Sequence, residues 1–257
     1  MKVVIIGAGN VATVLGRKML DAGHTIIQVV ARNAENADAL SVRLHTAAAY
    51  HLSAVDPYAD LYVIAVSDAS IAEVASHLQV NDKIVVHTAA AVSKEVLASC
   101  SKNYGVLYPL QSLKKELERL PPVPVIVDGN NLATVNLLKE FSLGWAQSVS
   151  VANDEKRLKL HLAAVIANNF TNHLLAVCEQ YCKTEQLDFN VLHPLVQETI
   201  ARIGESSAAA VQTGPAIRND NGTLEKHRQL LAAQPDLLKI YRFMTESIKD
   251  FCRTNTP

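Results

Sequence analysis

A glycine-rich turn near the start of the chain restricts its fold more than any other feature of the sequence. The turn, Gly7-Ala8-Gly9-Asn10-Val11-Ala12, directly follows the β-branched run 3–6. In a Gly-x-Gly-x-x-Ala pattern the first glycine permits a tight turn, the second lets the backbone approach a pyrophosphate, and the alanine lets a helix pack closely on the strand. The N-terminus of that helix offers free N–H groups and a positive dipole end to phosphates. The turn predicts dinucleotide binding by Gly7, Gly9, Asn10, Val11 and Ala12, with a purely structural strand–turn–helix as the alternative.

Short apolar runs alternate with amphipathic stretches through residues 1–152. Runs such as 61–66 are apolar on both faces, which is typical of strands in a parallel sheet that is covered on both sides. We expect strands at 3–6, 25–31, 61–66, 83–87, 106–108, 123–127 and 146–150, and helices at 11–21, 34–44, 69–77, 93–100 and 132–141. This alternation predicts an α/β Rossmann domain, a doubly wound parallel sheet, over residues 1–152.

Helical periodicity replaces the strand signals after residue 152. We expect helices at 154–184, 190–205, 224–233 and 235–253. Residues 153–257 are therefore predicted to form an all-α domain. We expect this domain to mediate homodimerisation, because such long apolar helices rarely bury every face within about 100 residues.

The end of the second predicted strand favours NADP(H) over NAD(H). An NAD site usually places Asp or Glu there to accept from the ribose hydroxyls. Here Arg32 and Asn33 follow the strand, and no acid occurs before Glu35. Arg32 can pair with a 2′-phosphate and Asn33 can donate to it. The alternative is that Arg32 is simply a solvated side chain at a strand end.

Further cofactor candidates follow the next two predicted strands. The third strand ends, and a helix begins, at Val66, Ser67 and Asp68. In this fold that turn borders the cofactor ribose. Ser67 or Asp68 could equally be an N-cap, with Ser70 and Glu73 forming a capping box. Thr88 ends the following strand and so also points toward the carboxyl edge of the sheet, where ligands bind.

Composition and charge exclude several classes of partner. The chain has 24 basic and 25 acidic side chains and a net charge of -1, which gives no electrostatic reason to propose nucleic acid or anionic lipid. No apolar run reaches membrane length, and the first run is too short for a signal peptide, so we expect a cytoplasmic protein. The four cysteines show no paired metal-ligand spacing, nor do His173, His193 and His227, so we expect no metal site.

Several longer motifs resemble those of a known family. They lie at 104–111 (Tyr-Gly-Val-Leu-Tyr-Pro-Leu-Gln), 161–173, 194–199 and 213–220 (Thr-Gly-Pro-Ala-Ile-Arg-Asn-Asp), followed by His227. Together they resemble, over essentially the whole chain, the Rossmann-like proteins that carry the C-terminal domain of unknown function 2520. The resemblance implies an NADP-type Rossmann domain and a helical dimerisation domain like that of 6-phosphogluconate dehydrogenase. It also implies a relation to pyrroline-5-carboxylate reductase and deazaflavin-dependent NADP reductase.

The chain departs from these relatives at three places. The family pattern usually continues Ser-Gly after Thr88, but here it continues Ala89-Ala90. Asn219 stands where glycine is common, a change that we expect to alter the backbone of the 213–220 loop. In related hydroxyacid dehydrogenases, a lysine one turn before an Asn pair exchanges the proton of the reacting oxygen. Val165 occupies the matching position here.

A polar line along the predicted 154–184 helix is the candidate catalytic face. Successive helical residues turn by about 100°, so one face collects Arg157, His161, Asn168 and Asn172. Their partners could be a substrate or an internal hydrogen-bond network. In place of the missing lysine, His161 is the candidate proton donor. Asn168 could hold the substrate carbonyl or the nicotinamide carboxamide, and Asn172 is a candidate substrate contact.

Other candidate residues lie outside this helix. Glu198 could orient His161 or act as the acid. Tyr108, at a strand end, is a competing proton donor and substrate contact. Arg218 and Asp220 lie in the 213–220 loop, where Arg218 could hold an anionic substrate or form an interface salt bridge with Asp220.

Together these features predict an NADP(H)-dependent oxidoreductase. We expect it to transfer hydride to or from a small carbonyl, hydroxy or imino substrate in the cleft between its domains. The alternative is a non-catalytic dinucleotide-binding sensor or interaction protein that keeps the fold without the chemistry. The missing lysine and the Ala89-Ala90 pair favour this alternative.

Overall fold

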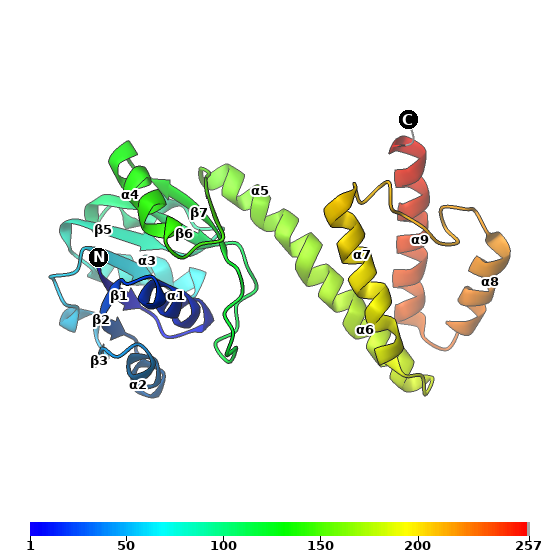
Figure 1. Ribbon diagram of the computed structural model, residues 1–257, viewed down its shortest axis with the longest axis horizontal. Helices are drawn as coiled ribbons and strands as arrows, with labels where there is room; N and C mark the ends of the chain where they lie inside the picture. The colour runs from blue at the N-terminus through cyan, green and yellow to red at the C-terminus, as the bar shows by residue number, and fades with distance from the viewer. Residues whose placement is uncertain (256–257) are drawn as a thin grey trace. The chain divides into compact units, whose positions relative to one another are not determined.

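The protein folds into two compact units. The computed structural model describes residues 1–255, and its compact units are Met1–Asn169 and Phe170–Pro257 (Figure 1). We call them the Rossmann unit and the helical unit. The predicted boundary at 152/153 follows the last strand, whereas the compact units divide within the helical stretch that begins at Asp154. A domain boundary at 152/153 stays a prediction.

The Rossmann unit is built on an eight-stranded sheet with the order β3-β2-β1-β4-β5-β6-β7-β8. The strands are β1 (Lys2–Ile6), β2 (Thr25–Val30), β3 (Ala47–Ala49), β4 (Leu61–Ile64), β5 (Asn81–His87), β6 (Ser101–Pro109), β7 (Pro124–Gly129) and β8 (Ser148–Val151). All neighbours are parallel except β6 and β7. The order reverses direction between β1 and β4, as in a doubly wound sheet. The predicted α/β Rossmann fold is confirmed.

Two features of the sheet differ from expectation. The edge strand β3 was not predicted, because its three alanines carry no strand propensity. β7 runs antiparallel to β6, because the connection between them is the Pro-rich segment 110–123 rather than a crossover helix. Parallel neighbours need such a crossover, whereas antiparallel neighbours do not.

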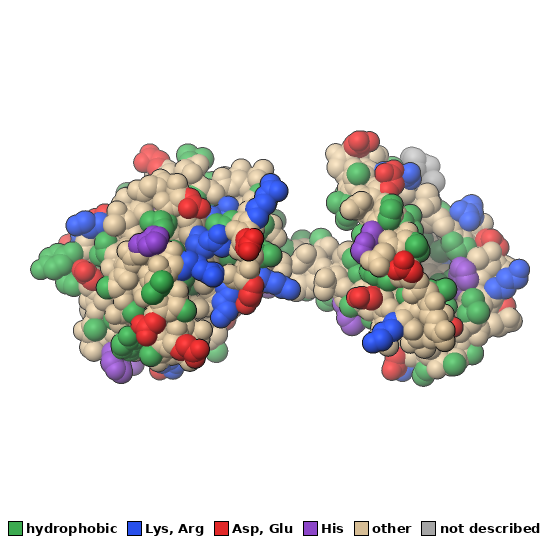
Figure 2. All heavy atoms as spheres, turned by 60° about the horizontal axis from the view of Figure 1, so that its bottom comes forward, with side chains coloured by type: hydrophobic (Ala, Val, Ile, Leu, Met, Phe, Trp, Pro, Cys, Tyr) green, Lys and Arg blue, Asp and Glu red, His purple; other side chains and the backbone are tan. Residues whose placement is uncertain are grey.

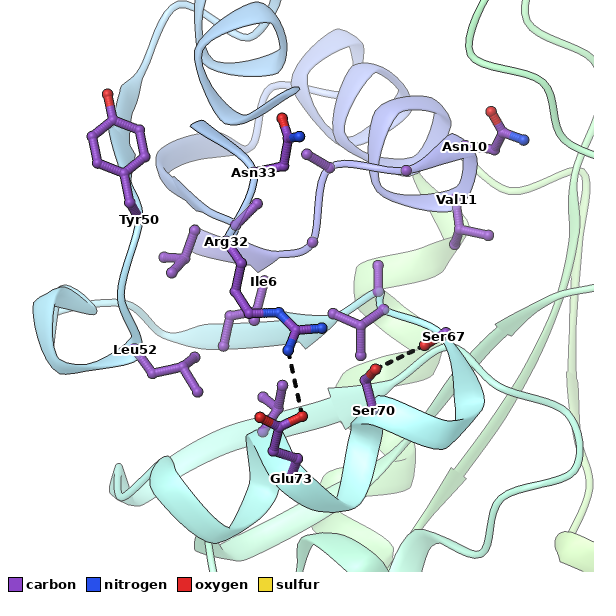
Figure 3. A pocket seen from close by; sticks show the side chains of 18 residues that line it. Ile6, Asn10, Val11, Arg32, Asn33, Tyr50, Leu52, Ser67, Ser70 and Glu73 are labelled. Carbon is purple, nitrogen blue, oxygen red and sulfur yellow. Dashed lines mark hydrogen bonds and ion pairs between the residues drawn. The ribbon is translucent and has the colours of Figure 1, made fainter. Parts of the chain in front are cut away.

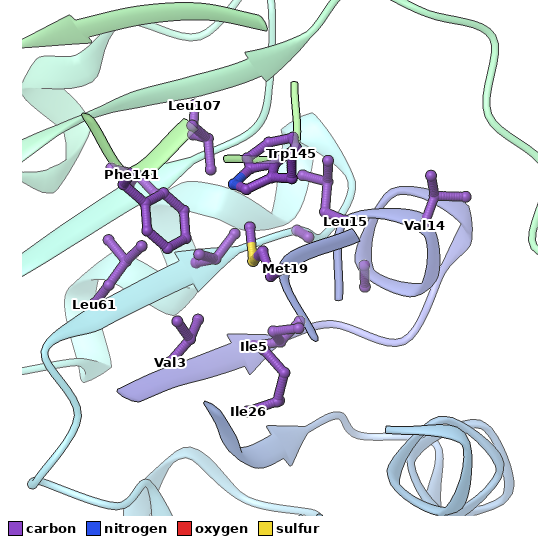
Figure 4. Packing of buried hydrophobic residues seen from close by; sticks show 14 of the residues in the cluster. Val3, Ile5, Val14, Leu15, Met19, Ile26, Leu61, Leu107, Phe141 and Trp145 are labelled. Atoms are coloured by element: carbon purple, nitrogen blue, oxygen red, sulfur yellow. The ribbon is translucent and has the colours of Figure 1, made fainter. Parts of the chain in front are cut away.

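Helices cover both faces of the sheet. They are α1 (Asn10–Asp21), α2 (Ala34–Arg43), α3 (Asp68–His77) and α4 (Leu132–Leu143). Alternate side chains of β1 enter opposite cores, since successive residues of a strand point to opposite faces. Val3 and Ile5 pack with α1, α2 and α4 in the core of Figure 4, and Val4 and Ile6 pack with α3 in the other core. These two cores fix β1, and with it the turn that follows.

The predicted helix at 93–100 is wrong. Only a 3-10 turn, Lys94–Leu97, forms there. The backbone just before it is instead held by Arg157, whose Nε donates to the Ala90 carbonyl (3.0 Å) and whose Nη2 donates to the Val92 carbonyl (2.6 Å).

The predicted helix at 154–184 forms, but a π-helical segment interrupts it. α5 (Asp154–Ala164) leads into the π-helix η3 (Val165–Phe170), and α6 (Thr171–Thr184) follows. A π-helix bonds each N–H to a carbonyl five residues back and so has a wider turn than an α-helix. The regular turn of about 100° per residue therefore fails across η3. The alignment of Asn168 and Asn172 with His161 that this spacing predicted does not hold.

The helical unit continues with α7 (His193–Glu205), α8 (Asn221–Leu230) and α9 (Pro235–Asn255), preceded by the 3-10 turn η4 (Phe189–Leu192). It buries few side chains in the described residues: Cys182, Ala216, Leu224, Leu231 and Thr245. None of the helices within residues 1–255 is long and apolar enough to cross a membrane.

Candidate functional site

The turn after β1 has the geometry that its sequence requires. Gly7 has a φ of 123°, and a Cβ there would lie 2.2 Å from the carbonyl oxygen of Ala65. Only glycine can occupy this position. Gly9 is the opposite case, because a Cβ there would meet no atom within 4 Å. The space beside Gly9 is therefore open to a ligand, while Gly7 lets the turn lie close to the end of β4.

The first turn of α1 presents backbone donors to that space. The helix begins at Asn10, and Gly9 caps it without a side-chain hydrogen bond. The amides of the first helical turn have no carbonyl partner within the helix and carry its positive dipole end. Ala12 is fully buried in the core beneath the turn, where a larger side chain would separate α1 from the sheet. The turn can bind a phosphate group through backbone N–H groups.

A cavity of about 490 Å³ opens at this turn (Figure 3). It is lined by most of the predicted cofactor residues: Gly7, Gly9, Asn10, Val11, Arg32, Asn33, Val66 and Ser67. These residues come from the ends of β1, β2 and β4, which meet at the carboxyl edge of the sheet. The cavity combines apolar walls with polar groups at its rim, as expected for a nucleotide site.

Arg32 has an acidic neighbour across the cavity. Its Nη1 lies 3.6 Å from Oε2 of Glu73, which reaches in from α3 (Figure 3). Both side chains are largely exposed, 80% and 61%, so the ion pair is weak and Arg32 can turn to another anion. Asn33 caps α2 by accepting from the amide of Asn36 (2.8 Å), which leaves its side-chain NH₂ group free to donate.

The predicted capping box of Ser70 and Glu73 is wrong. α3 begins at Asp68, earlier than that pattern requires, with Ser67 at the N-cap position. The Ser67 hydroxyl bonds to that of Ser70 (2.8 Å) and not to a helix amide. Glu73 pairs with Arg32 instead. Ser67 and Ser70 both line the cavity and can contact a ligand there.

Three predicted cofactor residues, Ala12, Asp68 and Thr88, lie outside the cavity lining, and several lining residues, Tyr50 among them, were missed. Asp68 is exposed at the start of α3, and Thr88 is buried just after β5. Tyr50 lines the cavity from the end of β3, and its hydroxyl donates to Asp38 (2.8 Å). Because β3 itself could not be predicted, no sequence signal pointed to Tyr50.

Tyr108 and His161 meet within the Rossmann unit. The Tyr108 hydroxyl lies 3.0 Å from Nδ1 of His161, and the two rings pack edge to face with centroids 6.0 Å apart. Burial raises the pKa of Tyr108 above its usual value, while the charge of Arg157 opposes this shift and the carboxylate of Asp68 adds to it. Tyr108 therefore stays protonated at neutral pH. The two candidate proton donors that the sequence offered as competitors form one hydrogen-bonded pair.

Arg157 fixes the helix that carries His161. Its side chain is fully buried and also bonds Oδ1 of Asp154 (2.7 Å), one turn earlier on α5. Asp128, on β7, pairs with Lys94 (2.9 Å) and lies 4.0 Å from Arg157. Burial, followed by the charge of Arg157, lowers the pKa of the neighbouring His87 to about 4. His87 is therefore neutral at neutral pH beside the buried Arg157. Arg157 and His161 are the two residues of the polar line on α5 that contact the rest of the Rossmann unit.

Comparison with known proteins identifies the family. The domain of unknown function 2520 matches residues 123–248, and the family described as NADP oxidoreductase, coenzyme F420-dependent, matches residues 2–91. A Bacteroides fragilis protein provisionally assigned as an NADP oxidoreductase is 33% identical in sequence. The match covers 97% of this chain and 98% of that one, with a TM-score of 0.88. The chain belongs to this NADP oxidoreductase family. The resemblance that the sequence motifs indicated is confirmed.

More distant structures share the fold. A Thermotoga maritima protein is 21% identical, with coverage of 98% of both chains and a TM-score of 0.74. The reductive aminase of Aspergillus terreus, solved with NADPH4, cyclohexanone and allyl amine, is 14% identical. That match covers 99% of this chain and 94% of the aminase, with a TM-score of 0.71. No curated protein matches the chain.

The remaining candidate catalytic and substrate-binding residues lie between α5 and α7 and in the 213–220 loop. Asn168, in η3, and Asn172, on α6, are exposed. Glu198, on α7, accepts from Nε of Arg202 (2.6 Å), one turn along the same helix, while His161 has Tyr108 as its partner. The catalytic and substrate-binding roles of these residues stay predictions.

Residue 219 of the 213–220 loop has a backbone conformation that favours glycine. Asn219 has a φ of 53°, a left-handed conformation that glycine favours and asparagine tolerates. A difference from the backbone of the family's loop at this position stays a prediction. Asp220 caps α8 by accepting from the amide (3.0 Å) and hydroxyl (2.7 Å) of Thr223. Arg218 precedes this cap, and its predicted contact with an anionic substrate is untested.

The two glycines of the turn give opposite substitution effects. Gly7→Ala should lower the free energy of unfolding by about 3 kcal/mol, because the new Cβ is strained and meets the Ala65 carbonyl. Gly9→Ala should change it by less than about 0.5 kcal/mol. The Gly9→Ala methyl group should nevertheless weaken NADPH binding by about tenfold or more. Urea denaturation and calorimetric titration measure the two effects. Unchanged NADPH binding by Gly9→Ala would place the phosphates elsewhere.

Proposed function

We propose that this protein is an NADP(H)-dependent oxidoreductase that reduces a carbonyl or imine group of a small molecule. The observation that carries the proposal is the cavity at the Gly7–Ala12 turn. There, backbone N–H groups that can bind a phosphate lie in the same cavity as the cationic side chain of Arg32. A bound NADPH would supply a hydride to the substrate. The residues of the chain would hold the cofactor and provide the proton.

The cavity fits the parts of a dinucleotide in order. The pyrophosphate would lie against Gly9 and the start of α1, where there is open space and free N–H groups. The adenosine ribose would lie between the ends of β2 and β4, beside Ser67. Arg32 and the free amide of Asn33 would bind a 2′-phosphate. Glu73 is the competing group, because its carboxylate could accept from an unphosphorylated ribose or repel a phosphate.

Arg32 and Glu73 test which nucleotide the site prefers. NADPH should raise the melting temperature more than NADH does. Arg32→Ala should weaken NADPH binding by about 10- to 100-fold, as expected for the loss of a charge-assisted hydrogen bond, and leave NADH binding unchanged. Glu73→Gln should tighten NADPH binding, because it removes the acid that competes for Arg32. Greater stabilisation by NADH would refute the preference for NADP, and no stabilisation by either nucleotide would refute the cofactor proposal.

The Tyr108–His161 pair can deliver a proton from one defined atom. When His161 is protonated, Nδ1–H donates to the Tyr108 oxygen and leaves the phenolic O–H free to face a substrate. Transfer of that phenolic proton to a developing alkoxide or amine is then balanced by transfer of the Nδ1 proton to Tyr108. The raised pKa of Tyr108 keeps the phenol protonated between turnovers. The pair can thus replace the lysine that is absent at Val165.

Substitution of either member of the pair should remove chemistry and spare cofactor binding. Tyr108→Phe and His161→Ala should each lower turnover on a carbonyl or imine panel by about 10²- to 10⁴-fold, with NADPH affinity within twofold of wild type, roughly 0.4 kcal/mol. Tyr104→Phe is the matched control, because Tyr104 lies on the same strand but bonds to the exposed Glu95. Stopped-flow NADPH oxidation measures turnover. If wild type binds NADPH but none of the carbonyl or imine substrates in the panel causes it to oxidise NADPH, the non-catalytic alternative is favoured.

A homodimer through the helical unit is also part of the proposal. In a single chain the unit exposes many large apolar side chains (Figure 2), among them Phe170, Val191, Leu195, Ile200, Leu230 and Phe243. Phe243 is 73% exposed. Monomeric proteins rarely leave so much apolar surface on one small unit. A second copy of the same chain would cover it without a further partner.

Light scattering coupled to size exclusion should give twice the mass of one chain. Phe243→Ser should shift the protein toward monomer at micromolar concentration, because it places a hydroxyl in an apolar interface. Leu132→Ser is the control, since Leu132 is 80% exposed but lies on α4 of the Rossmann unit. A wild-type monomer at working concentration would contradict the proposed dimer.

A further inference from the structure

The segment between β6 and β7 is docked across the two helices that begin at the nucleotide site. The amide of Lys115 donates to Oδ1 of Asn10 (3.1 Å), and the carbonyl of Lys115 accepts from Nη1 of Arg43 (2.9 Å). Arg17 donates to the carbonyls of Leu117 (2.7 Å) and Glu118 (2.8 Å). Three side chains of α1 and α2 therefore hold the backbone of a segment that has no regular structure of its own.

These contacts place Lys115 beside the phosphate-binding turn. A hollow of about 230 Å³ is lined by Ala8 and Thr13 next to that turn, by the first turns of α2 at Asn36 and Ala39, and by Lys115. Ala8 also lines the nucleotide cavity, so the two spaces meet at the same residue. Asn36 is one helical turn beyond Asn33. The hollow thus lies at the α2 end of the site.

Two cationic side chains line the hollow, Arg43 and Lys115. Arg43 uses its guanidinium on the Lys115 carbonyl. The Lys115 ammonium forms no salt bridge with any residue in the described range 1–255. Glu116 is the acid in the hollow lining. Basic side chains gather on this unit of the molecule in Figure 2, although the chain as a whole has a net charge of -1. A fixed backbone with an unpaired ammonium is suited to binding an anion.

We propose that Lys115 binds the 2′-phosphate of NADP(H) from the side opposite Arg32. The inference rests on the proposed function, since it adds a second cation to the same nucleotide. Lys115 would then determine specificity, because NADH has no phosphate at this position. Arg17 would act as a positioning residue, since it holds the segment at Leu117 and Glu118 without reaching the nucleotide itself.

Variants of the segment test the role of Lys115. Lys115→Ala should raise the dissociation constant of NADPH by about tenfold and leave that of NADH unchanged, as expected for one lost phosphate contact of roughly 1.4 kcal/mol. Lys114→Ala is the matched control, because Lys114 precedes it on the same segment but does not line the hollow. Glu116→Gln should lower the NADPH dissociation constant several-fold, since it removes the opposing charge. Calorimetric titration of the full-length protein measures all three.

Arg17→Met tests the positioning step separately. It should weaken NADPH binding but not NADH binding, and the double variant with Lys115→Ala should bind NADPH no more weakly than Lys115→Ala alone. Equal weakening of both nucleotides by Lys115→Ala would assign Lys115 to the pyrophosphate or to folding and overturn the inference. So would equal effects of Lys114→Ala and Lys115→Ala. If the wild-type protein does not bind NADPH at all, both the proposed function and this inference fail. That result differs from failure of the inference alone, in which the wild-type protein binds NADPH and only the variants behave differently from expectation.

Discussion

The close approach of the first turn to the end of β4 is the constraint on which the nucleotide site depends. A carbonyl oxygen of Ala65 lies where any Cβ of residue 7 would be, so the turn can pack there only as glycine. This contact brings the start of α1 to the carboxyl edge of the sheet, and the burial of Ala12 keeps α1 against the strands. The backbone N–H groups at the start of α1, Arg32 and Ser67 then face one cavity, because β1, β2 and β4 all end beside this turn.

A second constraint, the buried Arg157, organises the opposite end of the same edge. An arginine without solvent contact needs partners for its charge and its donors. Nε and Nη2 find them in two backbone carbonyls of the 88–93 segment and in Asp154, and the carboxylate of Asp128 lies 4.0 Å from Nη1. The result is a fixed start for α5, which carries His161 to Tyr108 one turn later. In the polar line along this helix, Arg157 therefore holds the helix in place, and His161, one helical turn later, is the candidate catalytic residue.

Local patterns predicted the features that local physics controls, and failed where distant residues decide. The glycine turn, the buried strands and the candidate Arg32 were predictable because turn geometry and burial depend on neighbouring residues. Glu73 was read as part of a capping box, and its place opposite Arg32 requires knowledge of how α3 packs. The 93–100 segment has helical spacing, but Arg157 takes its preceding carbonyls. The π-helix at Val165–Phe170 breaks the period on which the alignment of Asn168 with His161 relied.

The absence of lysine at Val165 changes what the chemistry requires of the rest of the site. A lysine donates a proton directly and needs only to lie near the reacting atom. A phenol with a raised pKa is a weak acid, so it needs a partner that restores its proton as it leaves. In the proposed chemistry His161 would be such a partner, because its Nδ1 already bonds the phenolic oxygen. This replacement depends on a fixed helix, since a shift of α5 would separate the pair. The buried Arg157 anchor and the Tyr108–His161 pair are thus one arrangement, in which burial at one turn would support the proposed proton transfer at the next.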